Sequence, residues 1–350
     1  MKFLIAGLGS VGRRHLRNLR ALGETNILLY RTHHATLSDD ELTGIPVETD
    51  LRRALDPSAG SGQAKPDAVI VANPTALHLD VAIPAAEAGC HIFLEKPVSG
   101  SMQGLDRLAA AAKKSGSRIL VGFQFRFHPT LRKAADLIAG GVLGQVLTAH
   151  AHWGEYQPNW HPWEDYRQSY AARDDLGGGV VKTLTHPLDY VRWLVGEVDS
   201  VWSFNGHISP LELDVEDVGE IGLRFANGAV GSVHVNYVQR PPVHRLEIVG
   251  TKGTLRWDNA DGILNFYQMP AAFGMWSANP SAPVVEQFAP PDGFERNVLF
   301  LDQMRHFIAV ARGEADSICT LEDGVHTLQV ALAAKRSAAQ GKLISLKGIL

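Results

Sequence analysis

A glycine-rich stretch near the amino end, GLGSVG, has the residue types and spacing that hold a phosphate group. Gly7 allows a tight turn, Gly9 lets the backbone approach a pyrophosphate, and Gly12 lets a helix pack closely on a strand. Ser10 and Val11 would open that helix, whose first N–H groups and partial positive charge attract an anion. The stretch predicts a dinucleotide site; the alternative is a glycine-rich turn that binds nothing.

A histidine, His186, stands beside a proline in the segment LGGGVVKTLTHPLDYVRWLVG. Imidazole titrates near neutral pH, so a positioned histidine can accept the proton of a substrate hydroxyl. Because proline fits the first turn of a helix and not its interior, a helix is expected to begin at Thr185 or His186, with Lys182 before it. The alternative interpretation is that His186 has a structural role and takes no part in chemistry.

A lysine, Lys96, follows an apolar strand in HIFLEKPVS. It is therefore expected at the carboxyl end of a parallel sheet, the edge at which open α/β folds bind ligands. An ammonium group there can hydrogen-bond a substrate oxygen and stabilise the negative charge that develops on it.

The end of the second expected strand, in NILLYRTHH, bears on the choice of dinucleotide. NAD-binding sheets usually carry an acidic residue there, which accepts the ribose hydroxyls and repels a 2′-phosphate. Arg31 and Thr32 occupy this place, with Arg13 as a helper, and they favour NADP(H) over NAD(H). The alternative is that Arg31 is a solvated charge at a strand end.

Residues 1–122 alternate short apolar runs with helical patterns, which predicts a parallel sheet covered on both faces. Strands are expected within KFLIAG, NILLYR, DAVIVANP, HIFLEKP and RILVGFQFR, with helices between them. A small, polar, proline-bounded stretch at 56–67 is expected to be a surface loop without chemistry.

Residues 123–350 have the pattern of an α+β domain with an antiparallel sheet. A helix is expected over TLRKAADLIAGGVLG and a strand over QVLTAHAHWG. Asn227 and Gly228 lie between two alternating apolar runs, a strong hairpin signal, and RLEIVGTKGTLRW indicates a second hairpin. Two amphipathic helices end the chain, and their packing back on the first domain is left open.

The composition gives no reason to expect a nucleic acid or a membrane as partner. The 350 residues are 45% hydrophobic and 20% charged, with a net charge of −4. No apolar run approaches the ~18 residues of a membrane-spanning helix, and the first apolar run is too short for a signal peptide. Two cysteines make no disulfide framework, so a reducing compartment, the cytoplasm, is expected.

Residues 153–170, WGEYQPNWHPWEDYRQSY, contain six Trp or Tyr side chains. Such rings have flat apolar faces that suit stacking on the C–H face of a sugar. The candidates for substrate contact are Trp153, Tyr156, Trp163 and Tyr166. The segment predicts a substrate-side loop or a subunit contact; the alternative is that its rings pack the loop onto its own domain. His150 and His152 alternate as on a strand, and no metal site is expected.

Five motifs, GLGSVGRRH, VIVANPTALH, HIFLEKPVS, GFQFRFHP and GGGVVKTLTHPLDYVRWLVG, occur in a specific order. In this order the chain resembles the Gfo/Idh/MocA family of NAD(P)-dependent oxidoreductases. The resemblance implies a Rossmann domain over 1–122 and, over 123–350, an α+β domain with an open antiparallel sheet. That second domain would bind substrate and form a homodimer or homotetramer through the sheet. Sugars, nucleotide sugars or cyclitols would be the substrates, oxidised or reduced at a carbinol carbon.

The resemblance also implies roles for individual residues. Lys96 corresponds to the catalytic lysine of the family, and His186 to its active-site histidine. Further cofactor contacts would come from Asn73, Pro74, His78, Glu95 and Gln124. Arg126 would lie near the nicotinamide or the substrate. Apart from the resemblance, Lys182 and Asp189 are further candidates for substrate contact.

The chain departs from the family at Lys182, where relatives often have an aspartate four residues before the histidine. Any acid–base role of that aspartate is therefore absent. A charged Lys182 close to His186 would favour the neutral imidazole, ready to accept a proton. Lys182 either contacts the substrate, an acidic one being an option, or points to solvent.

Three functions are open at this point. The first is an NADP(H)-preferring dehydrogenase or reductase of a sugar or polyol. The second is cleavage of a glycosidic bond by transient oxidation, with no net redox change, as some relatives perform. The third is a non-catalytic dinucleotide sensor or scaffold, which the missing aspartate allows and the presence of both Lys96 and His186 disfavours.

Overall fold

The structure is a computed structural model that describes residues 1–32, 37–56, 64–268 and 284–347. The loop expected over 56–67 lies mostly outside these residues, because residues 57–63 are not among them.

Contacts divide the chain into two units. The first consists of residues 1–124, 168–178 and 295–328, and the second of residues 125–167, 179–294 and 329–350. The chain therefore crosses between the two units more than once. The sequence predicts a single domain boundary, after residue 122.

A six-stranded parallel sheet forms the centre of the first unit, with strand order β3-β2-β1-β4-β5-β6. The strands are β1 (Phe3–Ala6), β2 (Ile27–Tyr30), β3 (Val47–Glu48), β4 (Ala68–Val71), β5 (His91–Leu94) and β6 (Ile119–Val121). Every residue of β1, β4 and β6 is buried, as expected for parallel strands covered on both faces. The predicted Rossmann-type arrangement is confirmed, and β3 is an additional strand too short to leave a pattern.

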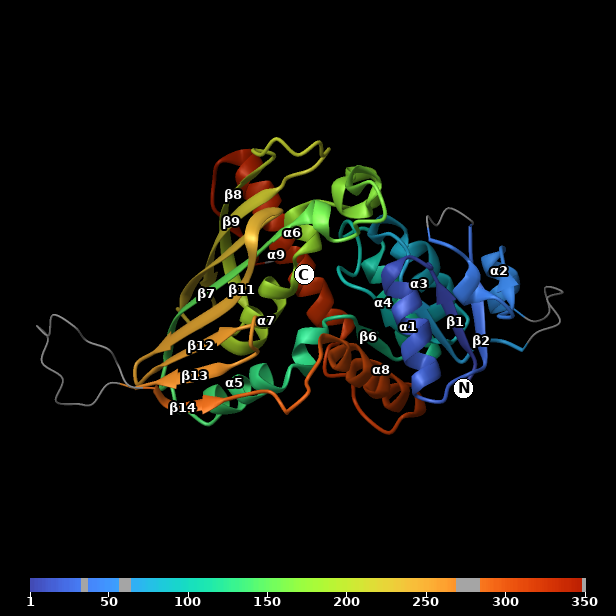
Figure 1. Cartoon of the computed structure of the whole chain (residues 1–350), viewed down its shortest axis with the longest axis horizontal. Helices are drawn as coiled ribbons and strands as arrows, with labels where there is room; N and C mark the ends of the chain where they lie inside the picture. The colour runs from blue at the N-terminus through green and yellow to red at the C-terminus, as the bar shows by residue number, and fades with distance from the viewer. Residues whose placement is uncertain (33–36, 57–63, 269–283, 348–350) are drawn as a thin grey trace, which may run out of the picture. The chain divides into compact units, whose positions relative to one another are not determined.

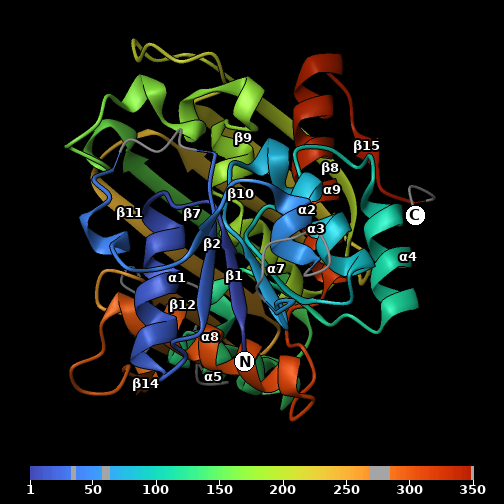
Figure 2. The same ribbon diagram turned by 90° about the vertical axis from the view of Figure 1, so that its right-hand side faces the viewer.

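Helices cover both faces of this sheet (Figure 2). The helices of the first unit are α1 (Ser10–Ala21), α2 (Leu51–Leu55), α3 (His78–Glu87), α4 (Leu105–Ser115) and α8 (Arg296–Arg312). Helix α8 contacts α1, while α2 and α4 contact α3. Arg312 donates to Glu24 at 2.7 Å, which fixes the end of α8 beside the turn that follows α1.

A nine-stranded sheet forms the second unit (Figure 1), with strand order β14-β13-β12-β11-β7-β10-β9-β8-β15. The strands are β7 (Val146–Tyr156), β8 (Val198–Gly206), β9 (Val218–Phe225), β10 (Val230–Asn236), β11 (Val238–Gly250), β12 (Thr254–Asp258), β13 (Leu264–Tyr267), β14 (Val284–Phe288) and β15 (Ile344–Ser345). Both predicted hairpins are present, as β9–β10 and β11–β12.

The second sheet is mixed and not wholly antiparallel as expected. Strands β7 and β10 pair in parallel. The chain leaves the sheet after β7, passes through two helices, and returns as the meander β8–β9–β10. The last strand of that meander therefore runs alongside β7 in the same direction.

Side chains alternate between the two faces of this sheet, and one face is packed against helices. The helices are α5 (Pro129–Ala139), α6 (Val180–Thr183), α7 (His186–Val195) and α9 (Leu321–Gln340). Helices α5, α6 and α7 contact β12, β9 and β7 respectively (Figure 1). Helix α9 begins in the first unit and continues in the second. In the described part of the chain, no helix combines the length and the apolarity needed to cross a bilayer.

Gly324, in the first turn of α9, allows a close approach that an alanine would disturb. A Cβ atom on Gly324 would overlap Val98 and come within 3.0 Å of Val121. Alanine normally stabilises a helix relative to glycine, but here we expect Gly324→Ala to lower the free energy of unfolding by roughly 1–3 kcal/mol. Urea unfolding followed by circular dichroism measures the change.

The control is the same substitution in a Val98→Ala background. The penalty of Gly324→Ala should be smaller there, because the overlapping side chain has been shortened. An increase in stability on Gly324→Ala in the wild-type background would show that the contact is not restrictive.

Candidate active site

The glycine-rich loop after β1 packs directly against the loop after β4. Gly7 has a φ of +91°, and a Cβ atom there would overlap the backbone of Ala72 and Asn73. A Cβ atom on Gly12 would overlap the carbonyl oxygen of Gly7, so α1 starts immediately beside the turn. Gly9 differs, because nothing lies within 4 Å of its Cβ position. Gly7 and Gly12 therefore allow the tight turn and the close packing that their positions predicted, and open space lies beside Gly9.

The amino end of α1 fits an anionic ligand. Gly9 is the N-cap, no side chain caps the helix, and no acidic residue lies in the first turn, which begins with Ser10 and Val11. Nearby, Asn73 donates from Nδ2 to the carbonyl oxygen of Leu77 at 2.8 Å, whereas its buried Oδ1 has no partner among the described residues. A helix start of this kind attracts a pyrophosphate, so the residues present fit a dinucleotide.

Arg31 and Thr32 follow β2 as expected, but Arg31 is not a solvated charge. Its guanidinium donates two hydrogen bonds to Asp39, at 2.7 and 2.8 Å, and its side chain is 9% exposed. Arg13 lies 3.6 Å from the same carboxylate and donates to the carbonyl oxygen of Leu8 at 2.9 Å. The two arginines expected to bind a 2′-phosphate thus share an acidic neighbour that the sequence did not indicate.

Lys96 follows β5 at the carboxyl edge of the first sheet, next to the buried acid Glu95. Glu95 Oε1 lies 2.7 Å from Nε2 of His15. Burial acts to raise the pKa of Glu95, but the hydrogen bond with His15 and the charges of His15, Lys96 and His78 outweigh it, so the pKa is lowered. An ionised Glu95 therefore stands beside the ammonium of Lys96.

His15 is a site residue that sequence reasoning missed. It lies in α1, is fully buried, and meets the rings of Phe93 and Phe300 edge-on at 4.7 and 6.5 Å. Its only sequence signal is its place one turn after the glycine loop, which does not reveal a partner 80 residues away.

The other cofactor candidates also follow strands at the carboxyl edge of the first sheet. Pro74 and His78 follow β4, and Gln124 follows β6 and is buried. His78 Nε2 lies 3.0 Å from the carbonyl oxygen of Asn73, and burial lowers the pKa of this histidine. The first unit therefore brings together Lys96 and the candidates from the loops after β1, β4, β5 and β6.

The three glycines before Lys182 allow close packing within their units. A Cβ atom on Gly177 would lie 3.0 Å from that of Thr75, and one on Gly178 would lie 2.7 Å from the carbonyl oxygen of Ala171. Gly179, with a φ of +105°, leaves space for the carboxylate of Glu216. The glycines thus allow close packing of the backbone that precedes His186.

His186 is the first residue of α7, with Thr185 as N-cap and Pro187 in the first turn. This start confirms the one predicted from the proline. Lys182 lies before it in the one-turn helix α6 and is only 5% exposed. The alternative in which Lys182 points to solvent is therefore wrong.

Two aromatic rings pack against His186 in the second unit. Trp153 stacks on it with 5.5 Å between ring centroids and 28° between planes, and Phe125 meets it edge-on at 5.0 Å. Trp153 also stacks on His244, at 4.4 Å and 3°. At 5% exposure, Trp153 is a core residue of this unit and not an exposed platform for a sugar.

Arg126 and Asp189, two candidate substrate contacts, bind each other. Arg126 donates from Nε and Nη2 to the two carboxylate oxygens at 3.0 and 2.8 Å, and both side chains are buried. A bidentate pair of this kind is strong and directional. It anchors α7 to the short 3₁₀ helix η4 (Gln124–Phe127).

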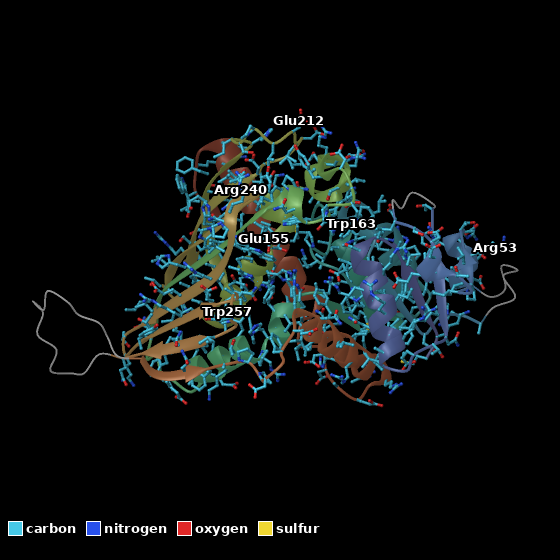
Figure 3. The ribbon with its side chains drawn as sticks, in the orientation of Figure 1. Arg53, Glu155, Trp163, Glu212, Arg240 and Trp257 are labelled. Atoms are coloured by element: carbon cyan, nitrogen blue, oxygen red, sulfur yellow. The ribbon has the colours of Figure 1, made fainter. Side chains whose placement is uncertain are left out.

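The other aromatic candidates differ in their surroundings, and Figure 3 labels one of them, Trp163. Arg240 lies 4.0 Å from the ring centroid of Tyr156, and the hydroxyl of Tyr166 accepts a hydrogen bond from the backbone N–H of Glu212. These two rings pack on their own unit. Trp163 is 62% exposed and meets His161 at 5.2 Å. Across the described residues, no three His, Cys, Asp or Glu side chains gather in a way that could hold a metal.

Two family models match the chain. Residues 1–123 match the oxidoreductase family with an NAD-binding Rossmann fold, and residues 131–256 match the GFO/IDH/MocA C-terminal domain. Together the matches cover more than two thirds of the sequence, in the order that the motifs indicated.

Individual relatives agree with these matches. The chain is 25% identical over 370 residues to myo-inositol 2-dehydrogenase of Thermotoga maritima, covering 100% of both proteins. It is 30% identical over 202 residues to 2,7-anhydro-N-acetylneuraminate hydratase of Mediterraneibacter gnavus, covering 56% of this chain and 52% of that protein.

The fold is also that of a solved structure, levoglucosan dehydrogenase in complex with NADH and levoglucosan. The TM-score is 0.82 at 23% identity, and 99% of each chain is covered. With both family models matched in order, the chain belongs to the Gfo/Idh/MocA family of oxidoreductases, whose first domain is an NAD-binding Rossmann fold.

Proposed function

We propose that this protein transfers hydride between a bound nicotinamide dinucleotide and a carbinol or keto carbon of a sugar, nucleotide sugar or cyclitol. The observation that carries the proposal is the edge of the first sheet, where a glycine loop suited to pyrophosphate and the Glu95–Lys96 pair occur together. The names of two relatives, a myo-inositol dehydrogenase and a levoglucosan dehydrogenase, support the substrate class.

The bound nicotinamide supplies the redox chemistry. The protein has to move the hydroxyl proton, and we assign this step to a ring nitrogen of His186. We assign to Lys96 a hydrogen bond from Nζ to a substrate oxygen, on which the ammonium group stabilises negative charge. The charge of Lys96 is one of the influences that lower the pKa of Glu95 and so keep its carboxylate ionised. We assign Lys182, buried before α7, to a polar or acidic group of the substrate.

A screen of sugars, sugar acids, nucleotide sugars and cyclitols with both dinucleotides tests the activity by absorbance of the reduced nicotinamide. A second candidate function is cleavage of a glycosidic bond without net redox change, which the relative named as a hydratase favours. Product formation by mass spectrometry without a lasting change in absorbance would identify it. Cofactor binding with no product from any compound would favour a sensor.

Lys96→Met and His186→Gln are expected to lower kcat/KM by about 10²- to 10⁴-fold, because each removes a group that acts on the reacting oxygen. The dissociation constant of the dinucleotide, measured by isothermal titration calorimetry, should change by less than about threefold, since neither side chain is assigned to the pyrophosphate. Lys65→Met is the control, because Lys65 is an exposed lysine of the same unit whose Nζ donates to the carbonyl oxygen of Ala88. Wild-type turnover in either active-site variant would refute the assignment.

Gly9→Ala and Gly12→Ala are expected to separate cofactor binding from folding. Gly9→Ala places a methyl group in open space, so the melting temperature should be unchanged while dinucleotide affinity falls by roughly tenfold or more. Gly12→Ala forces a clash with Gly7, so both quantities should fall. Thermal melts and calorimetry measure them. Unaltered affinity in Gly9→Ala would place the pyrophosphate elsewhere.

We propose a preference for NADP(H) over NAD(H), supported by Arg31 and Arg13 at the end of β2. A 2′-phosphate would compete with Asp39 for the guanidinium of Arg31. Arg31→Ala should therefore weaken NADP(H) about tenfold relative to NAD(H), and Asp39→Asn should strengthen NADP(H), as measured by the ratio of dissociation constants. Arg17→Ala, which removes an exposed arginine paired with Glu41, is the matched control. An unchanged ratio in Arg31→Ala would disprove the preference.

We further propose a homodimer or homotetramer that forms through the outward face of the nine-stranded sheet. That face exposes Trp202 (38%) and Phe204 (66%), whose rings meet edge-on at 4.1 Å. Exposed aromatic pairs of this kind are typical of protein contacts. The cytoplasm is the proposed compartment, in keeping with the buried cysteines Cys90 and Cys319, neither of which is in a disulfide.

A further inference from the structure

The orientation of the His186 ring depends on the side chains packed against it. Helix α7 fixes the direction of the Cα–Cβ bond, but the imidazole still turns about two side-chain torsions. Trp153 stacks against this ring, and Phe125 meets it edge-on. These two neighbours therefore restrict the plane of the imidazole.

Trp153 is itself held at two points. Its indole Nε1 donates to Oε1 of Glu155 at 2.8 Å. The two residues are separated by one position on β7, so they share a face of the strand. On the neighbouring strand β11, His244 is the residue directly opposite Trp153, and the two rings stack almost in parallel. The indole thus cannot turn without breaking a hydrogen bond and a cross-strand stack.

The same contacts lead back to α7. Tyr190 stacks with His244 at 5.9 Å, and its hydroxyl lies 3.3 Å from Nε2 of that histidine. Tyr190 follows His186 by four residues, so the two side chains share one face of the helix. Helix α7 therefore packs on the β7–β11 pair with His186 against Trp153 and Tyr190 against His244.

We infer that Trp153 is a positioning residue for His186, with its indole held in place by Glu155 and His244. This inference rests on the proposed function, in which His186 moves the substrate proton. A ring that rocks in its site presents its nitrogen in the reactive direction for less of the time. Misdirection of the ring nitrogen lowers the rate of the chemical step much more than it lowers the affinity for substrate.

The kinetic test uses Trp153→Leu and Trp153→Phe. Trp153→Leu is expected to lower kcat by about 10- to 100-fold and to change KM by less than about threefold. Trp153→Phe keeps an aromatic face and should recover most of the loss. Glu155→Ala should lower kcat more than Glu155→Gln, which retains an acceptor oxygen for the indole N–H.

Trp257→Leu is the matched control, because it removes an indole of equal size from β12 of the same core (Figure 3), and β11 lies between β12 and the strand of Trp153. Trp257 lies 5.1 Å from His244 and 6.2 Å from Tyr190. If Trp257→Leu lowered kcat as much as Trp153→Leu at the same KM, the effect would be one of general packing and the inference would be overturned.

A nuclear magnetic resonance measurement tests the positioning without any turnover. With ¹³C-labelled histidine, assigned by the loss of signals in His186→Gln, the ring protons of His186 should carry the ring-current shift of the adjacent indole. Trp153→Leu should remove this shift, and Trp257→Leu should largely preserve it. Unchanged His186 signals in Trp153→Leu would overturn the inference. A wild-type protein that converts no substrate would refute the proposed function, and these spectra would still decide the positioning.

Discussion

The carboxyl ends of parallel strands lie at one edge of a sheet, and the candidate site residues of the first unit depend on this constraint. Four adjacent strands, β1, β4, β5 and β6, end there, and their loops carry the glycine turn, Asn73, the Glu95–Lys96 pair and Gln124. Burying the charge of Glu95 at this edge has a desolvation cost, which the hydrogen bond with His15 offsets. The acid can then remain ionised beside the ammonium of Lys96.

In the second unit, the main constraint is the placement of one imidazole, that of His186, on helix α7, which is buried on almost every side. Helix α7 is attached to its surroundings at three residues of one helical face. Asp189 forms a buried ion pair with Arg126, Tyr190 contacts His244, and His186 stacks with Trp153. The charges of Arg126 and Asp189 compensate each other, so α7 carries a rigid attachment without an isolated buried charge. Ring stacking then adds an orientation that a simple apolar contact would not give.

Local signals in the sequence were sufficient for many of these features. The glycine spacing predicted the turn before α1, the Asn227–Gly228 pair predicted the β9–β10 hairpin, and Pro187 predicted the start of α7. Features that depend on partners distant in the chain could not be predicted in this way. The parallel pairing of β7 with β10 depends on the path of the chain through two helices. The Glu95–His15 and Trp153–His244 contacts join residues that only the fold brings together. Asp39 was also missed, because a carboxylate eight residues beyond Arg31 has no fixed geometry before the loop is folded.

The outward face of the nine-stranded sheet carries a row of polar side chains that are already matched within the sheet. Strand register places Glu220, His234, His152, Arg245 and Asp258 side by side across five strands. Glu220 lies 2.7 Å from His234, Arg245 lies 2.6 Å from Asp258, and burial together with the nearby charges of His234 and Arg245 lowers the pKa of His152. A second surface laid on this row would meet few unbalanced charges. Self-association through this face would then depend little on ionic strength. The shape of the surface around the exposed pair Trp202 and Phe204 would determine which partner surfaces fit it.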